Sequence, residues 1–259
     1  MLFRSWAWAD TCCINKTSSA ELTEAINSMF QYYSRSEVCY AYLSDVPPLP
    51  TQGIVTWGFI NSVWHTRGWT LQELIAPKVV VFMTSDWTRI GTKYELADEL
   101  QKINGYPPAS VLRFEKDITE MSVAQRMSWA ANRETTRVED EAYSLFGLFG
   151  ISIPTLYGEG RNSFYRLQEE IMRTSTDTSL IAWLPSGQGF GVEMTVGSRE
   201  QLHEMIAHLC EEDEGPQNAD LKHLFAPSPS NFLLSSIVST TMWGNDMRTN
   251  SKVSHPVAE

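Results

Sequence analysis

The chain has 259 residues, enough for one large domain or for one domain with an appendage. Hydrophobic residues make up 42% and include 9 Trp, 9 Tyr and 11 Phe, which excludes a disordered chain. The formal net charge of -11 disfavours nucleic acid as a partner, because an acidic chain repels the phosphate backbone.

Compartment and metal binding follow from what the sequence lacks. No stretch approaches the roughly 20 apolar residues of a membrane-spanning helix, and the N-terminus lacks the layout of a signal peptide. The histidines are scattered, and the cysteines match no zinc pattern. We therefore expect a soluble cytoplasmic protein with no metal site. Its cysteines are interpreted as buried free thiols: Cys12, Cys13, Cys39 and Cys210.

The first third of the chain alternates strand and helix signals. Residues 6–13 are typical of a buried strand that ends near Asp10. A capping box then precedes an amphipathic helix over residues 20–33. Residues 38–43 predict a second strand because they are rich in aromatic and β-branched side chains. Strand, helix and strand with short connections predict a parallel βαβ unit.

Polar residues that follow strands are candidates for ligand binding. The apolar run at residues 79–83 predicts another buried, parallel strand. In an open α/β sheet, ligands bind beyond the carboxyl ends of the strands. The alternative is that such residues cap the next element. The candidates by position are Asp10, Ser44, Asp45, Ser85 and Asp86.

The rest of the chain is predicted to be mainly helical up to a boundary near residue 185. Helices are expected over residues 92–104, 122–133, 136–149 and 162–173, with a strand at 179–183. We divide the chain into a domain at 1–185 and a poorly structured extension at 186–259 with a short helix near 199–210. The core is predicted to include Trp8, Ile26, Met29, Phe30, Val80, Phe82, Trp129, Leu145, Phe146 and Leu167.

One carboxylate stands out as a candidate for chemistry. Trp69 and Glu73 are four residues apart and share a face of a predicted helix. Apolar neighbours raise the pKa of a carboxyl group, so Glu73 beside an indole is a candidate acid or base. The alternative is that Glu73 pairs with an arginine and that Trp69 belongs to the core.

Six motifs in order carry a family resemblance. They are Asp10-Thr-Cys-Cys-Ile-Asn-Lys16, the helix at 19–29, Arg67-Gly-Trp-Thr-Leu-Gln-Glu-Leu74, Arg126-Met-Ser-Trp-Ala-Ala131, Thr135-Thr-Arg-Val-Glu-Asp140 and Leu156-Tyr-Gly-Glu-Gly160. Together they closely resemble the fungal heterokaryon-incompatibility (HET) domain over about residues 6–185. The resemblance implies an effector of non-self recognition that triggers growth arrest or cell death. It also implies partners among other HET or sensor proteins, or a homo-oligomer.

The HET family is in turn remotely similar to TIR domains, some of which cleave NAD. The stretch Trp69-Thr-Leu-Gln-Glu73 has the spacing of the TIR Trp-Cys-x-x-Glu motif, with Thr70 in place of Cys. The resemblance implies a TIR-like, flavodoxin-like α/β fold with a largely parallel sheet, flanking helices and added helical segments. It places Glu73 on the catalytic carboxylate, with NAD as substrate and no bound cofactor.

The nucleotide would be held by further residues that the resemblance and the strand ends indicate. Arginines can meet phosphates through two parallel hydrogen bonds. The alternative is that Arg67, Arg126, Arg133 and Arg137 form ion pairs inside the fold with Glu134, Glu139, Asp140 and Glu159. The residues expected to bind the nucleotide are Asp10, Ser44, Arg67, Trp69 and Arg126.

The start of the sequence departs from the family pattern. About five residues precede the Trp-Ala-Trp-Ala run, where the family has a further strand and helix. We therefore expect either a truncated gene model or a degenerate paralogue, with an exposed sheet edge that invites a partner. Two alternatives to an enzyme stay open: an interaction module that signals by homotypic assembly, and an inert truncated paralogue.

Overall fold

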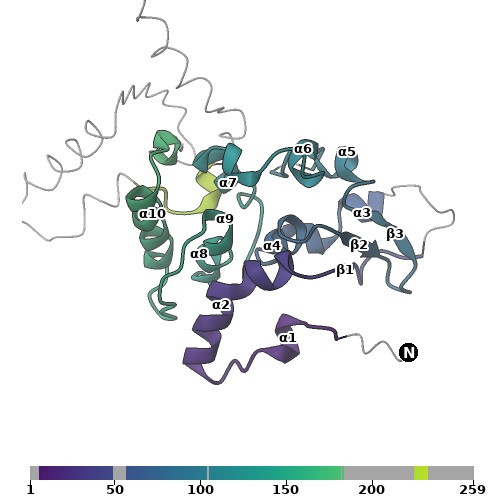
Figure 1. Ribbon diagram of the computed structural model, residues 1–259, viewed down its shortest axis with the longest axis horizontal. Helices are drawn as coiled ribbons and strands as arrows, with labels where there is room; N and C mark the ends of the chain where they lie inside the picture. Colours follow the sequence, from purple (N-terminus) through teal and green to yellow (C-terminus); the bar gives the residue numbers. More distant parts are fainter. Residues whose placement is uncertain (1–5, 49–56, 104, 182, 184–224, 233–259) are drawn as a thin grey trace, which may run out of the picture. The chain divides into compact units, whose positions relative to one another are not determined.

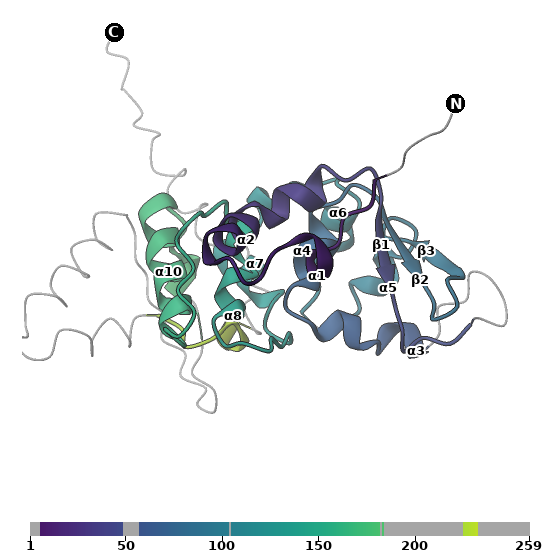
Figure 2. The same cartoon turned by 90° about the horizontal axis from the view of Figure 1, so that it is seen from below.

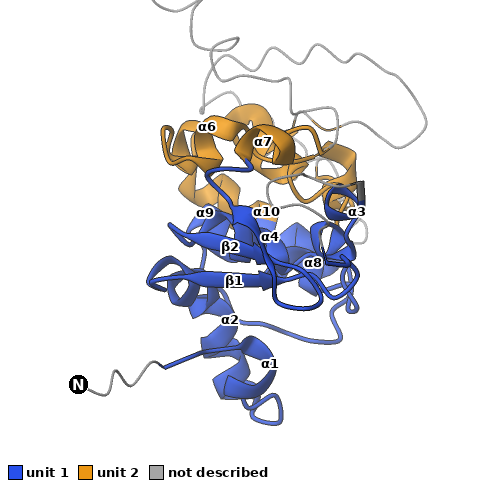
Figure 3. Cartoon of the chain, turned by 90° about the vertical axis from the view of Figure 1, so that its right-hand side faces the viewer, with its two compact units in different colours: residues 1–96, 134–167 blue, residues 97–133, 168–259 orange. Residues whose placement is uncertain are grey.

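A computed structural model describes residues 6–48, 57–103, 105–181, 183 and 225–232. The chain divides into two compact units, shown in Figure 3. Unit 1 comprises residues 1–96 and 134–167, and unit 2 comprises residues 97–133 and 168–259. The helix predicted near 199–210, and most of the predicted extension, lie outside the described residues.

Unit 1 is built on a small mixed sheet with the order β1-β2-β3, so the unit is α/β (Figures 1 and 2). The strands are β1 (Cys39–Tyr42), β2 (Val80–Met83) and β3 (Arg89–Thr92). β1 and β2 are parallel, which confirms the prediction for these two strands. β3 returns antiparallel to β2 after a short turn and was not predicted. One of the two strand pairs is therefore antiparallel.

Helices supply the rest of unit 1 (Figure 1). Helix α2 confirms the prediction for residues 20–33; it begins after Ser18, whose hydroxyl accepts a hydrogen bond from the Glu21 amide at 3.3 Å. The Glu21 carboxylate instead accepts from the Asn15 amide, so the predicted capping box is half formed. The elements are α1 (Asp10–Cys13), α2 (Ser19–Ser34), α3 (Trp57–Ile60), η1 (Val63–Thr66), α4 (Thr70–Ile75), α8 (Asp140–Tyr143), α9 (Phe146–Phe149) and the start of α10 (Asn162–Thr174).

The strand predicted over residues 6–13 is wrong. This segment forms the short helix α1, whose turn is closed by amides of Cys12 and Cys13 that donate to the Ala9 carbonyl. The Trp8 side chain is 38% exposed, so its placement in the core is also wrong. Its ring instead lies against the surface rings of Tyr32 and Tyr33 on α2. Aromatic contacts with a helix thus replace strand pairing, and the predicted first strand of the βαβ unit is not formed.

The remaining predicted core residues lie inside, except for Phe30, which is half-buried. Those that the structure buries are Ile26, Met29, Val80, Phe82, Trp129, Leu145, Phe146 and Leu167. Helix α9 packs against α2 at Gly147. A Cβ atom at this position would overlap the Phe30 side chain, so glycine sets how closely the two helices approach.

Unit 2 contains short helical segments, shown in orange in Figure 3. The helix predicted over 92–104 is reduced to α5, and the helix predicted over 122–133 is confirmed over α7. The strand predicted at 179–183 is wrong, because Asp177 accepts from the Ser179 amide and starts a helical turn. The elements are α5 (Ala97–Leu100), α6 (Ala109–Leu112), η2 (Ile118–Glu120), α7 (Val123–Ser128), the end of α10 and η3 (Thr178–Ile181).

Residues 225–232 are integrated into unit 2. The Gln168 side chain on α10 donates to the Ala226 carbonyl at 2.8 Å and accepts from its amide at 2.9 Å. Phe225 and Phe232 are fully buried. A buried amide satisfied on both sides fixes one register between α10 and this segment.

Replacing Gly147 should destabilise the protein according to the size of the new side chain. We expect Gly147→Ala to lower the free energy of unfolding by about 1–3 kcal/mol, because the α2–α9 contact must open. Gly147→Ser should cost more. Gly150 supplies the control. A Cβ atom added there would have nothing within 4 Å, so a loss of stability at this position comes from its φ of 66°, which disfavours any side chain, and not from steric overlap. Equal losses for Ala and Ser at position 147 in urea unfolding would contradict a steric origin.

Candidate functional site

The entrance to α4 is made by two segments that are distant in sequence. The Gly68 amide donates to the Glu134 carbonyl at 2.8 Å, and the Glu134 amide donates to the Thr66 carbonyl at 2.6 Å. A Cβ atom on Gly68 would overlap the Thr135 methyl group, so only glycine fits this approach. The motifs at 67–74 and 135–140 therefore belong to one structural unit.

Both ends of α4 are held by buried polar side chains. The Thr70 hydroxyl lies 2.7 Å from the Trp64 carbonyl oxygen and 2.8 Å from that of Arg67. At the other end the Lys93 ammonium donates to the Leu74 carbonyl at 2.9 Å. It also reaches the carbonyls of Ile75 and Pro77. A cation at a helix C-terminus is favourable because the last carbonyls carry partial negative charge.

Glu73 lies on α4, and its charge is set by burial and by four neighbouring groups. Burial raises the pKa of its carboxyl group to about 7, and the negative charge of Asp10 adds to this rise. Hydrogen bonds from Trp64 and Tyr33 and the charge of Arg67 act in the opposite direction, because they favour the carboxylate. The residue keeps partial exposure to solvent. Glu73 is therefore close to half ionised at neutral pH.

The Tyr33 hydroxyl and the Cys39 thiol, which both interact with the charge of Glu73, are held in their neutral forms. Burial raises the pKa of the Tyr33 hydroxyl, and the charge of Glu73 raises it further. The same two causes raise the pKa of the Cys39 thiol to about 12, against the opposing charge of Lys93. Burial lowers the pKa of the Lys93 ammonium to about 7. The site thus holds a carboxyl group and an amine that both titrate near neutrality.

The indole that hydrogen-bonds Glu73 belongs to Trp64. Trp69, which the spacing placed beside Glu73, is half-buried and packs against the cluster of Ile14, Ala25 and Met29. Its indole hydrogen-bonds Asp140, which also accepts from the Tyr157 hydroxyl at 2.9 Å. Trp69 thus links α4 to the Thr135–Asp140 motif, in agreement with the alternative that it belongs to the core.

Two neighbours of Glu73 were missed by sequence reasoning. Tyr33 lies on α2, and Trp64 lies on the turn before Arg67. No helical or strand period relates either position to Glu73, because both contacts are made by tertiary packing. The only signal in the sequence is that Trp64 falls within the motif-rich stretch of residues 62–74.

The carboxylates at the strand ends act as caps. Asp45 accepts from the Ser62 hydroxyl at 2.7 Å and from the Val63 amide at 2.8 Å, which starts η1. Asp86 accepts from Thr84 and Thr88 in the β2–β3 turn. Ser44 is exposed in the turn after β1 and is not among the groups that shift Glu73. Of the residues chosen by position, Asp10 joins Glu73.

The arginines have different surroundings. Arg67 acts electrostatically on Glu73 in unit 1. Arg137 lies over the Tyr157 ring at 4.4 Å and favours the ionised form of Asp140, in agreement with an internal structural role. Arg126 belongs to unit 2, where burial lowers the pKa of its guanidinium and the charges of Asp177 and Asp117 oppose that shift. Arg133, also in unit 2, lies over the Tyr106 ring at 5.1 Å.

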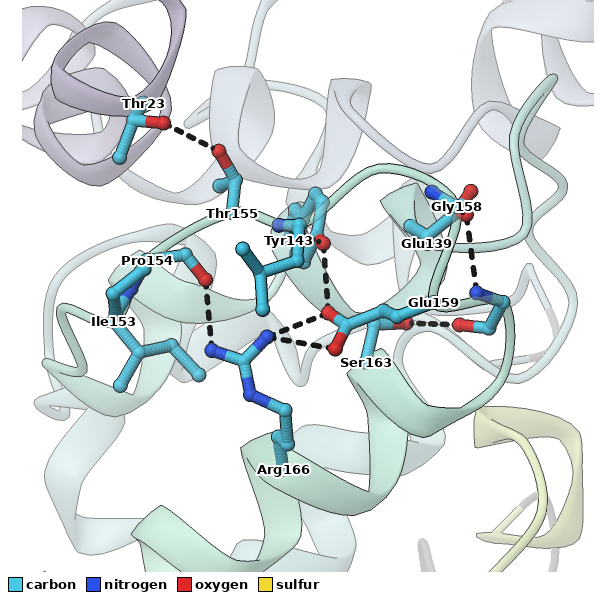
Figure 4. A network of polar contacts seen from close by, with 12 residues as sticks. Thr23, Glu139, Tyr143, Ile153, Pro154, Thr155, Gly158, Glu159, Ser163 and Arg166 are labelled. Atoms are coloured by element: carbon cyan, nitrogen blue, oxygen red, sulfur yellow. Dashed lines mark hydrogen bonds and ion pairs between the residues drawn. The ribbon is translucent and has the colours of Figure 1, made fainter. Parts of the chain in front are cut away.

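The Leu156–Gly160 motif is a structural junction, shown in Figure 4. One guanidinium nitrogen of Arg166, Nη1, contacts both carboxylate oxygens of Glu159 at 2.6 and 2.8 Å. It also accepts from the Tyr143 hydroxyl at 2.9 Å, and this hydroxyl accepts from the Leu156 amide at 2.8 Å. The motif therefore joins α8 to α10. The other guanidinium nitrogen, Nη2, donates to the Pro154 carbonyl at 2.8 Å, so Arg166 bonds both the side chain and the backbone of this region.

Glu139 also binds the Leu156–Gly160 motif, through its backbone amides. Its carboxylate accepts from the Gly158 amide at 2.8 Å and from the Gly160 amide at 3.1 Å (Figure 4). These backbone hydrogen bonds hold the pKa of Glu139 below its usual range. The spacing Thr136-x-x-Glu139 in the sequence would predict a capping box, but Glu139 bonds this turn and α8 begins at Asp140.

Over the part of the chain that the structure describes, no group of three or more His, Cys, Asp or Glu side chains is placed to hold a metal ion. Among the same residues no helix has both the length and the apolar character to cross a membrane.

Comparison with known proteins relates the chain to fungal incompatibility proteins. It is 45% identical over 173 residues to the vegetative incompatibility protein HET-E-1 of Podospora anserina. The match covers 65% of this chain and 13% of that protein, so the chain spans a small part of its relative. A family model for a domain of unknown function (DUF8212) matches residues 162–259. No solved structure gives a significant match.

The charge balance at Glu73 predicts opposite effects of two conservative substitutions. Asp10→Asn should lower the pKa of Glu73, because it removes a neighbouring negative charge. Tyr33→Phe should raise it, because the carboxylate loses a hydrogen-bond donor. Both values can be measured by NMR titration of protein labelled in its glutamate carboxyl carbons, with Glu73→Gln assigning the signal. Shifts of the same sign would contradict the arrangement.

Burial of Glu73 also predicts how stability depends on pH. The pKa of Glu73 is higher in the folded protein than in the unfolded chain. The stability that the protonated group contributes is therefore fully present at a pH below the pKa of the unfolded chain, and it is lost as the pH rises through about 7. Glu73→Gln should remove this loss and stabilise the protein at about pH 8 by on the order of 2 kcal/mol. Urea unfolding at several pH values measures the difference. The exposed residue Glu24 supplies the control Glu24→Gln, for which an equal gain would contradict the assignment.

Proposed function

We propose that the chain is an effector domain of fungal vegetative incompatibility and that Glu73 cleaves the nicotinamide–ribose bond of NAD or a related nucleotide. The role in incompatibility is supported by the similarity to HET-E-1. The chemistry is supported by one observation: Glu73 is a carboxyl group with a pKa of about 7, surrounded by Asp10, Tyr33, Trp64 and Arg67. The TIR-like spacing of Trp69 and Glu73 is consistent with it.

A desolvated carboxylate suits this reaction because positive charge develops on the sugar as nicotinamide departs. A negative charge held close to that position stabilises the transition state more than it stabilises the neutral ribose. The burial that raises the pKa of Glu73 also means that its ionised form is poorly solvated. It therefore gains more from an approaching cation than an exposed carboxylate would.

Neighbouring groups have distinct roles in the proposal. Trp64 and Tyr33 orient the carboxylate through their hydrogen bonds. Arg67 is exposed and its positive charge favours the carboxylate form of Glu73, so it is the residue proposed to meet a phosphate. Asp10 keeps a share of Glu73 protonated, and binding of a cationic nicotinamide would release that proton.

A second candidate function is assembly without turnover. It is favoured by β1, which is an edge strand of the three-stranded sheet. Tyr40 on this strand is 61% exposed, and Tyr42 stacks on Trp87 with ring centroids 4.6 Å apart. Edge strands and exposed aromatic side chains are typical of surfaces that pair with another chain. In this case Glu73 would serve structure alone.

Glu73→Gln separates the two candidates. If the chain is an enzyme, the variant should release nicotinamide from NAD at least about 100-fold more slowly and should lose toxicity in a fungal host. For the unmodified protein, kcat/KM should rise with pH through the pKa of Glu73, because the carboxylate is the active form. Glu24→Gln should match the unmodified protein in both measurements.

Two results would count against the enzyme. One is that the unmodified protein releases no nicotinamide, alone or concentrated on a surface, while Glu73→Gln still arrests growth. The other is concentration-dependent assembly in light scattering that persists, with full toxicity, in Glu73→Gln. Circular dichroism of each variant verifies that the fold is intact.

A further inference from the structure

The cysteine pair of α1 differs from its sequence-based interpretation. Cys12 and Cys13 were expected to be buried, and both are exposed free thiols. Their sulfur atoms lie 3.9 Å apart. They contribute nothing to the core, yet oxidants in solution can reach both.

The two thiols have unequal surroundings. The Ala9 amide donates to Cys13 Sγ at 3.5 Å. The Cys12 thiol donates to the Ala9 carbonyl at 3.8 Å, and its hydrogen bond with Cys13 raises its pKa. The S–H group of Cys12 is thus directed at the backbone, whereas the Cys13 sulfur accepts from it, so we assign the first attack on an oxidant to Cys13.

Helix α1 lies between two anchors that reach the Glu73 site. Before it, the Trp8 ring contacts Tyr33 edge-on at 5.5 Å, and Tyr33 hydrogen-bonds Glu73. After it, Ile14 is buried in the cluster against which Trp69 packs. The helix itself begins at Asp10, whose charge raises the pKa of Glu73. A change in the backbone of α1 can therefore affect the site through Tyr33, through Trp69 and through Asp10.

A disulfide between adjacent residues is incompatible with this helix. Neighbouring Cβ atoms on a helix point about 100° apart, whereas a disulfide needs them about 3.8 Å from one another. Closing the bond must break the turn in which Cys12 and Cys13 donate to the Ala9 carbonyl. The resulting bond is strained, so thiols should reduce it readily.

We propose that Cys12 and Cys13 are a modification site, a vicinal dithiol that peroxide oxidises to a disulfide, which unwinds α1 and moves Asp10 away from Glu73. The Cys13 thiolate attacks a peroxide oxygen and becomes a sulfenic acid, and the other oxygen leaves as hydroxide and takes a proton to form water. Cys12 sulfur then displaces the sulfenic hydroxyl, which leaves as a second water with the thiol proton. One peroxide is reduced, and two thiols are oxidised.

Oxidation of the two thiols is expected to lower the pKa of Glu73. Moving Asp10 away removes a repulsive charge, and opening α1 hydrates the carboxyl group, so both changes lower the pKa of Glu73. Oxidation would thereby increase the share of carboxylate at neutral pH. The regulatory meaning of this step rests on the proposed function, but the modification and its electrostatic effect are measured without any substrate.

The modification is tested by peptide mapping of the full chain after treatment with hydrogen peroxide. Trypsin cuts after Arg4 and Lys16, so one peptide carries both cysteines. We expect this peptide to lose two hydrogen atoms, resist alkylation and return to its dithiol form with dithiothreitol. Cys39, with its thiol pKa raised to about 12, should stay reduced and serves as the internal control. A peptide that remains fully alkylated, or is linked to another chain, would overturn the proposal.

Single substitutions test the assigned roles. Cys12→Ser should accumulate a sulfenic acid on Cys13 that dimedone traps, because the second thiol is missing. In Cys13→Ser the Cys12 thiol still donates to the Ala9 carbonyl, so several-fold less dimedone adduct should form on Cys12. Equal trapping in both variants would contradict the order of steps.

The link to Glu73 is tested by NMR titration of its carboxyl carbon in reduced and oxidised protein. The pKa should fall on oxidation and should not change when the variant carrying both Cys12→Ser and Cys13→Ser is treated in the same way. A disulfide that forms without moving this pKa would overturn the coupling. Because no NAD is present, failure here is distinct from failure of the proposed catalysis.

Discussion

The position of Glu73 depends on a helix too short to be stable by itself. Helix α4 has six residues, and isolated helices of this length do not persist in water. Its first turn is fixed by the Thr70 hydroxyl and by the close approach of Gly68 to Thr135, and its last carbonyls are bound by Lys93. These contacts come from separate parts of unit 1, so the site is a product of its tertiary structure.

The elements that could be predicted from the sequence are those with strong local signals. Helix α2 has an apolar stripe and a serine cap, and β2 is a continuous apolar run, so local chemistry and final structure agree. The predictions failed where tertiary contacts decide. Residues 6–13 have the composition of a strand, but Trp8 packs on the rings of α2. Strand β3 is short and contains Gly91, which weakens its signal.

The residues of the candidate site also divide into those that local sequence patterns predict and those that only tertiary packing places there. Glu73 could be chosen because its motif spacing is visible in the sequence, and Arg67 lies within the same motif. Helical spacing predicted Trp69 beside Glu73, but the indole that hydrogen-bonds Glu73 is that of Trp64, and Trp69 bonds Asp140. Tyr33 could not be found at all, because its contact depends on how α2 packs against α4. Spacing along the chain thus pointed to Glu73 as a candidate and missed part of its environment.

The parallel contact between residues 66–68 and Glu134 has a consequence for synthesis. A ribosome releases the chain from its N-terminus, so α4 emerges well before the segment that fixes its entrance. A nascent chain that ends before Glu134 contains Glu73 but lacks the partner that sets the start of its helix. The carboxylate therefore reaches its final environment only after most of unit 1 has been translated.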